Sequence, residues 1–399
     1  MFEIQTNNTY IETKLNELVS LLKERGAYFD PSLVLKEEGG NFSVTAKQKA
    51  EKPFWMKIPH NALTPFKEIA FDLQGDDLVL DDFKGNYDHQ NYKIIELLLS
   101  LYNETGKIAA HKKDMVWCQL KGDADRPLVE HLLKARDYEN QAFIQKVWGD
   151  EELYDEMVLI TFFMSRLIDC KLNRRIGTKP VKCIVPFIEF LNHDAYGSGY
   201  DNLYNKKGGA HMGVRMLPSF EPMDEICTNY GYFDGLDLLM QYGFLYQEAP
   251  FLCSVPMEFD LGDVGRVSLK AHHVAVPLGE IPEGYRDLGR YFPAMYIDHV
   301  KKNATLSHLF IPSEVAPLSL RRILGFVITQ MDSTLSEERC LAYIYDIESK
   351  IIETNLLYFR HFDRLCEGAQ SGIACETIKK LKKNVLNKIN NYQEIVKII

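Results

Sequence analysis

The sequence predicts an α+β fold, in which two strand-rich parts flank a helical block and a second helical region follows. Strand-like segments occur near residues 42–58, where Phe42, Val44 and Ala46 alternate with polar residues, and again between 184 and 228. Between these parts, from about 91 to 169, apolar residues recur at helical spacing. The same helical spacing dominates after about residue 256, so helices and strands occupy separate stretches of the chain.

The length of 399 residues is enough for two or three domains with sizeable cores. The change from one pattern to the next divides the chain into four parts. These are 1–90 (an N-terminal helix and the first strands), 91–180 (a helical insert), 181–255 (the second strand-rich part) and 256–399 (mainly helical).

The first part opens with a predicted helix, which Gly26 is placed to end. Two strands are expected after it, at residues 42–46 and 54–58, with Gly39-Gly40 at the turn before the first. The apolar positions of the helix step by three and four: Ile11, Leu15, Leu18, Val19 and Leu22.

The insert contains three apolar helical segments, the last of which runs from Met157 to Ile168. The first two are marked by residues that share a helix face: Ile94, Leu98 and Leu101, then Leu128, Leu132 and Leu133.

Strand patterns return at residues 184–187, 212–217 and 225–228, separated by turns rich in Gly, Pro and Asn. One more β-like segment is expected at 264–276, and helices follow to the end of the chain. Two helices carry clear apolar stripes: Leu320, Ile323, Leu324, Val327 and Ile328, and Ile378, Leu381, Val385, Ile389, Tyr392 and Val396.

Composition excludes several classes of protein. A net charge of −10 argues against binding to nucleic-acid phosphates, which depends on Lys and Arg. No apolar run reaches the roughly 18–20 residues of a membrane span, and no signal peptide is visible, so we expect a cytoplasmic protein without membrane contact. The eight cysteines form no CxC or CxxC pair, so we expect no metal site and reduced thiols.

Three motifs follow one another in the second strand-rich part. They are the stretch 185–193 (VPFIEFLNH), Asn229-Tyr230-Gly231, and 241–244 (QYGF). In this order they resemble the C-terminal half of a SET domain, in the branch that contains plant Rubisco large-subunit methyltransferase. The resemblance implies a SET β-fold with a pseudoknot, a helical insert, a C-terminal all-helical substrate-binding domain, and S-adenosyl-L-methionine as the cofactor.

The resemblance also assigns roles to residues of these motifs. Asn192 binds the amino-acid part of the cofactor, and the backbone of His193 approaches its adenine. In Ser165-Arg166, the arginine contacts the cofactor carboxylate, a task that suits a planar guanidinium. Tyr230 is the catalytic tyrosine, whose hydroxyl faces the transferring methyl group and also lies beside the cofactor.

Other residues are expected around the substrate amine. By resemblance, Tyr242 and Phe244 wall the lysine channel and the cofactor pocket, and Ile168 joins the channel. Tyr204 occupies the place of a second catalytic tyrosine near the amine. The loop before it is rich in glycine, so Tyr200 competes for that place.

The chain departs from the family pattern at two positions. Where the family has alternating glycines in a cofactor-binding turn, this chain has Gly39-Gly40-Asn41-Phe42, with the two glycines adjacent. Glu189 stands where the family often has aspartate. An adjacent pair of glycines still allows a tight turn with exposed amides. The resemblance therefore implies that Gly40, Asn41, Phe42 and Glu189 belong to the cofactor site.

We therefore expect a protein-lysine N-methyltransferase that acts on a non-histone protein, releases S-adenosyl-L-homocysteine and works as a monomer. The substrate is expected to dock on the C-terminal helices. Three alternatives stay open. One is a catalytically silent SET-fold binding module, suggested by the altered glycine turn. Another is a protein-histidine methyltransferase, although Leu167 and Ile168 stand where the histidine-specific branch has an asparagine that contacts the imidazole. The third is a methyltransferase that acts on a small molecule, which a large docking domain argues against.

Overall fold

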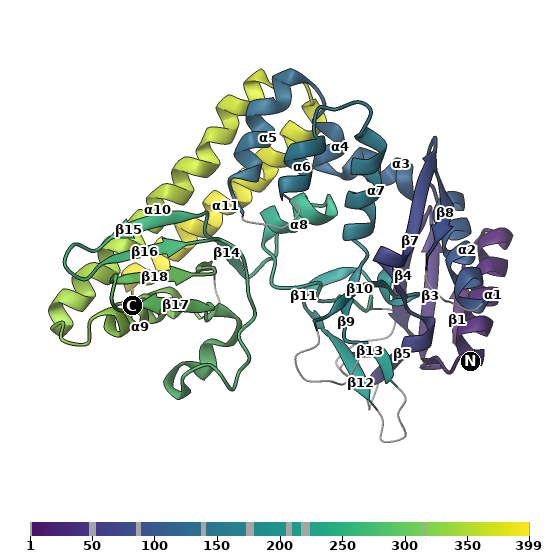
Figure 1. Cartoon of the computed structure of the whole chain (residues 1–399), viewed down its shortest axis with the longest axis horizontal. Helices are drawn as coiled ribbons and strands as arrows, with labels where there is room; N and C mark the ends of the chain where they lie inside the picture. The colour runs from purple at the N-terminus through teal and green to yellow at the C-terminus, as the bar shows by residue number, and fades with distance from the viewer. Residues whose placement is uncertain are drawn as a thin grey trace. The chain divides into compact units, whose positions relative to one another are not determined.

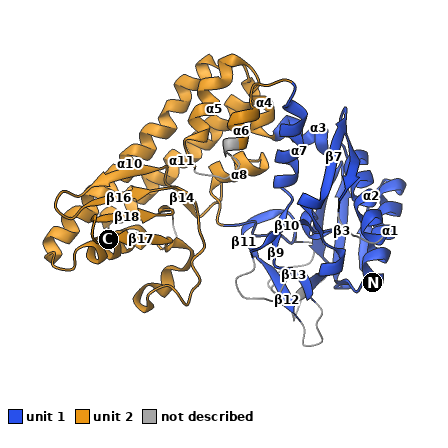
Figure 2. Ribbon diagram, viewed as in Figure 1, with its two compact units in different colours: residues 1–114, 152–231 blue, residues 115–151, 232–399 orange. Residues whose placement is uncertain are grey.

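The computed structural model of the chain describes residues 2–47, 53–84, 89–136, 141–172, 179–204, 210–216, 224–313 and 316–398. The chain forms two compact units, residues 1–114 with 152–231 and residues 115–151 with 232–399 (Figure 2). Each unit contains both helices and strands, which confirms the expected α+β class (Figure 1).

The first helix of unit 1, α1 (Thr9–Glu24), forms as predicted. The side chain of Asn8 caps it by accepting hydrogen bonds from the backbone N–H groups of Tyr10 and Ile11. All five residues of the predicted apolar stripe are buried. Gly26 follows the helix with φ of +99°, a conformation that side chains disfavour, and so ends it as expected.

The strands of unit 1 form three sheets and a hairpin. Their orders are β1-β3-β4, β12-β13-β5-β2 and β6-β10-β9, with β7-β8 as the hairpin. The predicted strands near 42–46 and 54–58 are β4 and β5, and β4 lies at the edge of its sheet. The strand bounds are β1 (Glu3–Gln5), β2 (Tyr28–Phe29), β3 (Leu33–Glu38), β4 (Asn41–Ala46), β5 (Phe54–Pro59), β6 (Thr64–Pro65), β7 (Ile69–Gln74), β8 (Asp77–Phe83), β9 (Ile168–Cys170), β10 (Val181–Ile184), β11 (His193–Ser198), β12 (Tyr200–Tyr204) and β13 (Ala210–Met216).

The helical insert is shared between the units. Unit 1 holds α2 (His89–Glu104), α3 (Lys107–Asp114) and α7 (Tyr154–Met164), whereas the helices of 115–151 belong to unit 2. The last apolar segment was expected to stay helical to Ile168, and this is wrong. The helix ends at Met164, because Ile168 starts β9 and pairs with Cys183 of β10.

Two other strand predictions need correction. The strand expected at 184–187 is β10, which ends at Ile184, because Pro186 has no N–H to donate and Phe187 has a positive φ of 68°. The segment 225–228 makes single backbone bridges on both sides instead of a continuous strand. The third strand, expected at 212–217, lies within β13, and Leu217 is outside the described residues.

Unit 2 contains the two predicted C-terminal stripes. Both are buried, on α9 and α11, apart from the last residue of the second stripe, which is only half-buried. The helices of this unit are α4 (Val116–Gln119), α5 (Arg126–Leu133), α6 (Gln141–Val147), α8 (Gly235–Tyr242), α9 (Ser319–Met331), α10 (Glu337–Gly368) and α11 (Gly372–Ile398). None of the helices described in either unit is both long and apolar enough to span a membrane.

The expectation that the C-terminal part is all-helical is wrong. Before α9 the chain forms a four-stranded sheet, β15-β16-β18-β17, and a two-stranded sheet, β14-β19. Only β16 falls in the predicted β-like segment. These strands have three or four residues each, which is too few for an alternating pattern to be recognised in the sequence. Their bounds are β14 (Phe251–Cys253), β15 (Met257–Asp260), β16 (Arg266–Leu269), β17 (Met295–Asp298), β18 (Asn303–Leu306) and β19 (Phe310–Pro312).

A buried charge cluster joins three segments of unit 2. Arg136 donates to Asp237 through Nε and to Asp234 through Nη2, each at 2.7 Å, and all three side chains are almost fully buried. Asp234 also caps α8 and accepts the backbone N–H of Cys253 at 2.8 Å. Because a buried carboxylate is costly without its partner, this cluster holds α8 and β14 to the segment after α5.

We predict that Arg136→Met lowers the free energy of unfolding by about 3–5 kcal/mol, because it leaves two buried carboxylates unpaired. Urea unfolding followed by circular dichroism measures the change. The matched control is Arg126→Met, which removes an exposed pair with Asp123 and should cost less than about 1 kcal/mol. Equal losses in the two variants would show that the buried cluster does not stabilise unit 2.

Candidate active site

The segment 225–230 crosses unit 1 between two parts of the chain that are far apart in sequence. On one side the N–H of Ile226 donates to the carbonyl of Val44 in β4 at 2.7 Å. On the other side the N–H of Thr228 donates to the carbonyl of Asn192 at 2.8 Å, and the N–H of Asn229 to that of Ser198 at 2.9 Å. The segment therefore extends the edge of one sheet while it pairs with the chain around β11.

This crossing brings Tyr230 to the Asn192-His193 motif. The hydroxyl of Tyr230 donates to the carbonyl of Leu191 at 2.6 Å, and its backbone N–H donates to Nδ1 of His193 at 3.2 Å. The two rings have their centres 5.1 Å apart. Burial lowers the pKa of His193 to about 4, so the ring is neutral at pH 7. Because Nδ1 accepts a hydrogen bond, the neutral ring carries its proton on Nε2.

The side chain of Asn192 ties the same two parts together. Its amide nitrogen donates to Glu225 at 2.6 Å and to the carbonyl of Phe42 at 3.3 Å. Phe42 in turn stacks on Phe190, with ring centres 4.3 Å apart. Residues 42, 190, 192 and 225 therefore form one wall of the site.

Arg166 lies just after α7, on the aromatic face of the insert. Its guanidinium is 3.7 Å from the ring centre of Phe162 and 6.0 Å from that of Tyr102, and Nη1 donates to the carbonyl of Phe162 at 2.9 Å. Burial lowers the pKa of Arg166, while Tyr102, Glu189 and Tyr230 oppose that effect. Arg166 therefore shares its electrostatic surroundings with Tyr102, Glu189 and Tyr230.

Glu189 faces the same corner from the short helix Ile188–Phe190. One carboxylate oxygen accepts the hydroxyl of Tyr102, and burial raises the pKa of Glu189 to about 7. Its other oxygen, Oε1, is buried and has no hydrogen-bond partner in the part of the chain that the structure describes. A buried acceptor without a donor is costly, so this oxygen points to a ligand that donates a hydrogen bond.

The adjacent glycines form the turn from β3 to β4. Both have positive φ, +57° at Gly39 and +84° at Gly40. The N–H of Gly40 donates to Glu37 at 2.8 Å, and a Cβ at Gly40 would lie 2.7 Å from the carbonyl oxygen of Thr105. Asn41 is exposed at the start of β4. The turn therefore packs against the loop between α2 and α3 and leads directly to Phe42.

The two candidate tyrosines of β12 lie in different surroundings. The hydroxyl of Tyr200 is 2.9 Å from the hydroxyl oxygen of Thr228, two residues before Tyr230, and burial raises the pKa of Tyr200 to about 12. Tyr204 is more exposed, and its hydroxyl donates to the carbonyl of Lys171. The structure thus brings Tyr200 to the segment that carries Tyr230. The assignment of Tyr204 stays a prediction.

The remaining expected channel residues are divided between the units. Ile168 is buried in β9 of unit 1. Tyr242 and Phe244 flank Gly243 at the end of α8, in unit 2, with ring centres 6.1 Å apart. The role of Tyr242 and Phe244 beside Tyr230 stays a prediction.

Two residues of the site were not assigned from the sequence. Glu225 stands in an acidic turn at the family's spacing, so that spacing could have identified it as a partner of Asn192. Tyr102 lies in the insert, where nothing in the sequence distinguishes it from other core positions. No cluster of three or more metal-binding side chains occurs among the described residues.

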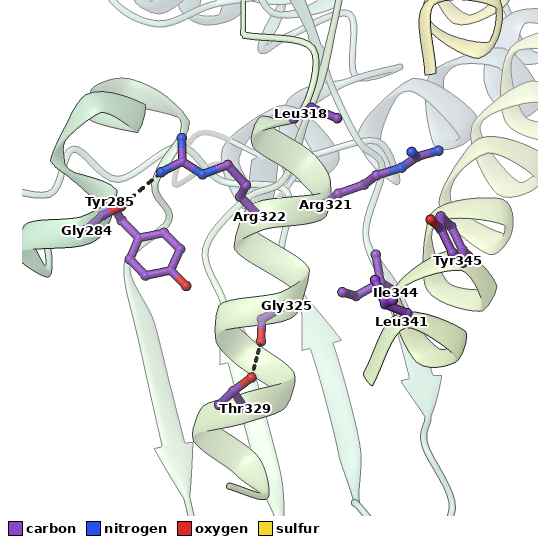
Figure 3. Close-up of a pocket in the computed structure, with 10 residues that line it drawn as sticks. All are labelled: Gly284, Tyr285, Leu318, Arg321, Arg322, Gly325, Thr329, Leu341, Ile344 and Tyr345. Atoms are coloured by element: carbon purple, nitrogen blue, oxygen red, sulfur yellow. Dashed lines mark hydrogen bonds between the residues drawn. The ribbon is translucent and has the colours of Figure 1, made fainter. Parts of the chain in front are cut away.

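A separate groove lies in unit 2 between α9, α10 and the segment around Tyr285 (Figure 3). Its volume is about 610 Å³, and Arg321 and Arg322 of α9 point to its opposite sides. Arg321 pairs with Glu348 at 3.0 Å and Arg322 pairs with Asp287, so each cation is balanced by a carboxylate. The described residues that line the groove include no histidine, cysteine or acidic side chain.

No protein-family model matches the chain, and no curated protein matches it significantly. Among solved structures, the chain is similar to the SET domain of LSMT bound to lysine and AdoHcy. The two sequences are 11% identical, the match covers 96% of this chain and 91% of that chain, and the TM-score is 0.44. Rubisco LSMT bound to AdoMet gives 11% identity, coverage of 96% and 92%, and a TM-score of 0.39. These names belong to the branch that the sequence motifs indicate.

We predict that Gly40→Ala destabilises the protein more than Gly39→Ala does. Both changes place a side chain at positive φ, which costs about 1–2 kcal/mol. Only Gly40→Ala also pushes a Cβ against the backbone of Thr105, since nothing lies within 4 Å of a Cβ at Gly39. Urea unfolding of the two variants and the wild type measures the loss in the free energy of unfolding for each change. Equal losses would contradict the close packing of this turn.

Proposed function

We propose that this protein is a SET-domain protein-lysine N-methyltransferase that uses S-adenosyl-L-methionine. The observation that carries the proposal is the crossing of residues 225–230, which places the hydroxyl and backbone of Tyr230 against Leu191 and His193. The sequence motifs for the cofactor and for catalysis, which are separate in the chain, occupy one site.

The chemistry of the site suits the amino-acid part of this cofactor. Arg166 supplies a positive charge for a carboxylate, and the unpaired Oε1 of Glu189 is an acceptor for an ammonium group. Asn192 and the turn at Gly40 would hold the cofactor from the side of β4. When bound, the cofactor supplies a methyl group made electrophilic by its sulfonium.

The chain's own residues have two tasks in this proposal. A lysine side chain has an ordinary pKa of about 10.4 and accepts a methyl group only through the lone pair of its neutral amine. A site with buried aromatic walls disfavours the charged ammonium. The hydroxyl of Tyr230 orients the amine, and holding the reacting groups in line provides a large entropic gain. Tyr230 is a positioning hydrogen-bonding group in this scheme, because phenols are weak bases at neutral pH.

Lysine is favoured over histidine as the target. Leu167 and Ile168 follow Arg166 and offer no side-chain hydrogen bond to a ring nitrogen. Ile168 is also buried in β9. In the same proposal a non-histone protein substrate docks on the C-terminal part, and the enzyme is a cytoplasmic monomer.

A silent binding module is the second candidate, because Asn41 replaces a glycine of the family's turn. The two functions differ in whether the pocket binds the cofactor and transfers its methyl group.

The decisive experiment incubates the purified protein with isotopically labelled S-adenosylmethionine and a cell lysate, then maps labelled residues by mass spectrometry. We expect label on a lysine side chain of a protein. Cofactor binding without any transfer would favour the silent module, and label on histidine would favour the protein-histidine alternative.

We predict that Tyr230→Phe lowers the rate of methyl transfer by about 10²-fold or more, because it removes the hydroxyl that orients the amine. Its affinity for the cofactor should be unchanged, since the backbone contacts remain. Single-turnover assays with labelled S-adenosylmethionine and the protein substrate measure the rate of methyl transfer. Calorimetry measures the affinity for the cofactor. The control is Tyr196→Phe, an exposed tyrosine of the same unit. Near-normal turnover in Tyr230→Phe would remove this residue from the catalytic role.

We predict that Tyr200→Phe slows methyl transfer more than Tyr204→Phe. The hydroxyl of Tyr200 contacts Thr228 and supports the segment that carries Tyr230, whereas that of Tyr204 contacts Lys171. The same single-turnover assay compares the two variants. A larger loss in Tyr204→Phe would restore Tyr204 as the second tyrosine of the site.

A further inference from the structure

A lysine of the insert lies on α3, a helix that packs beside Arg166. His111 of α3 packs on the ring of Phe162, with ring centres 5.4 Å apart, and the guanidinium of Arg166 covers that same ring. Lys107 is the first residue of α3, and its ammonium nitrogen is 5.4 Å from the ring centre of Phe42. The loop that carries it contacts the glycine turn, because the carbonyl of Thr105 is the atom that a Cβ at Gly40 would meet. Phe42 and Gly40 are both assigned to the cofactor site, so Lys107 borders that site.

The position of this positive charge is unfavourable in the protein alone. A cation at the first residue of a helix opposes the helix dipole. Burial and the charge of Arg166 both disfavour the ammonium form and lower the pKa of Lys107 to about 8. Within the described ranges, the structure gives its ammonium no ion pair and no hydrogen bond, only the face of the Phe42 ring.

The carboxylate whose charge acts on Lys107 is already hydrogen-bonded to other groups. Glu37, whose charge favours the ammonium of Lys107, accepts the N–H of Gly40 through one oxygen and the hydroxyl of Thr6 through the other. Two cations, Lys107 and Arg166, therefore share a partly buried corner without a carboxylate dedicated to Lys107. A bound anion would offset the cost of holding them there.

We propose that Lys107 is a second binding residue for the α-carboxylate of the cofactor, acting beside Arg166. This inference rests on the proposed function, because it takes S-adenosylmethionine as the ligand. In this arrangement Arg166 provides a planar guanidinium and Lys107 provides a compact charge from the first residue of α3. The pair would make the site selective for ligands that keep the carboxylate.

The test compares three ligands by titration calorimetry with the full chain: S-adenosylmethionine, S-adenosylhomocysteine and decarboxylated S-adenosylmethionine. Lys107→Met should weaken the first two at least about tenfold, the loss expected for one charge-assisted contact. It should change the affinity for the decarboxylated ligand less than about twofold, because that ligand has no carboxylate to bind. Lys107→Arg should retain most of the affinity for all three. The matched control is Lys113→Met, which removes the same charge from an exposed position of α3.

The outcomes separate the inference from the proposed function. Equal weakening of all three ligands by Lys107→Met would overturn the inference and assign Lys107 to the packing of Phe42. Unchanged binding of all three would also overturn it. A wild-type protein that binds none of the three would contradict the proposed function itself, and with it this inference. Thermal unfolding of each variant without ligand shows whether the fold is intact, and a folded Lys107→Met that loses only the carboxylate-bearing ligands supports the assignment.

Discussion

The candidate site depends on backbone hydrogen bonds that hold residues 225–230 between β4 and the chain near Asn192. Val44 and Ile226 are roughly 180 residues apart, so closing this loop costs conformational entropy that local contacts cannot repay. The cost is offset because the segment satisfies the open edge of β4 and pairs on its other side as well. Without these bonds, Tyr230 would have no fixed position relative to His193.

Several ionisable side chains near this crossing have pKa values shifted toward the neutral form. Arg166, Lys107 and Glu189 are all partly buried, and burial shifts the pKa of each toward its neutral form. Glu189 keeps one oxygen without a donor among the described residues. Perturbed groups of this kind cluster at functional sites, where a ligand completes their interactions. In unit 2, by contrast, Arg136 is matched by two carboxylates, as a purely structural cluster requires.

Much of the helical structure could be predicted from the sequence, whereas short strands could not. The stripes of α1, α9 and α11 span several turns, so their period is unambiguous and their buried faces follow. The strands from β14 to β19 have three or four residues each, and only their partners decide that they are strands. The end of α7 was missed for the same reason, because Ile168 is apolar in either state and pairs with Cys183.

The sequence by itself determined the α+β class and the identities of Asn192, His193, Arg166 and Tyr230 as candidate site residues, because each belongs to a contiguous motif. Tertiary structure alone decided which other groups join them. Tyr102 enters from the insert, Glu225 bonds to Asn192, and Tyr200 rather than Tyr204 contacts Thr228. The physical reason is that these contacts join segments far apart in the chain. Local pattern carries no information about which distant side chain or carbonyl a hydrogen bond will reach.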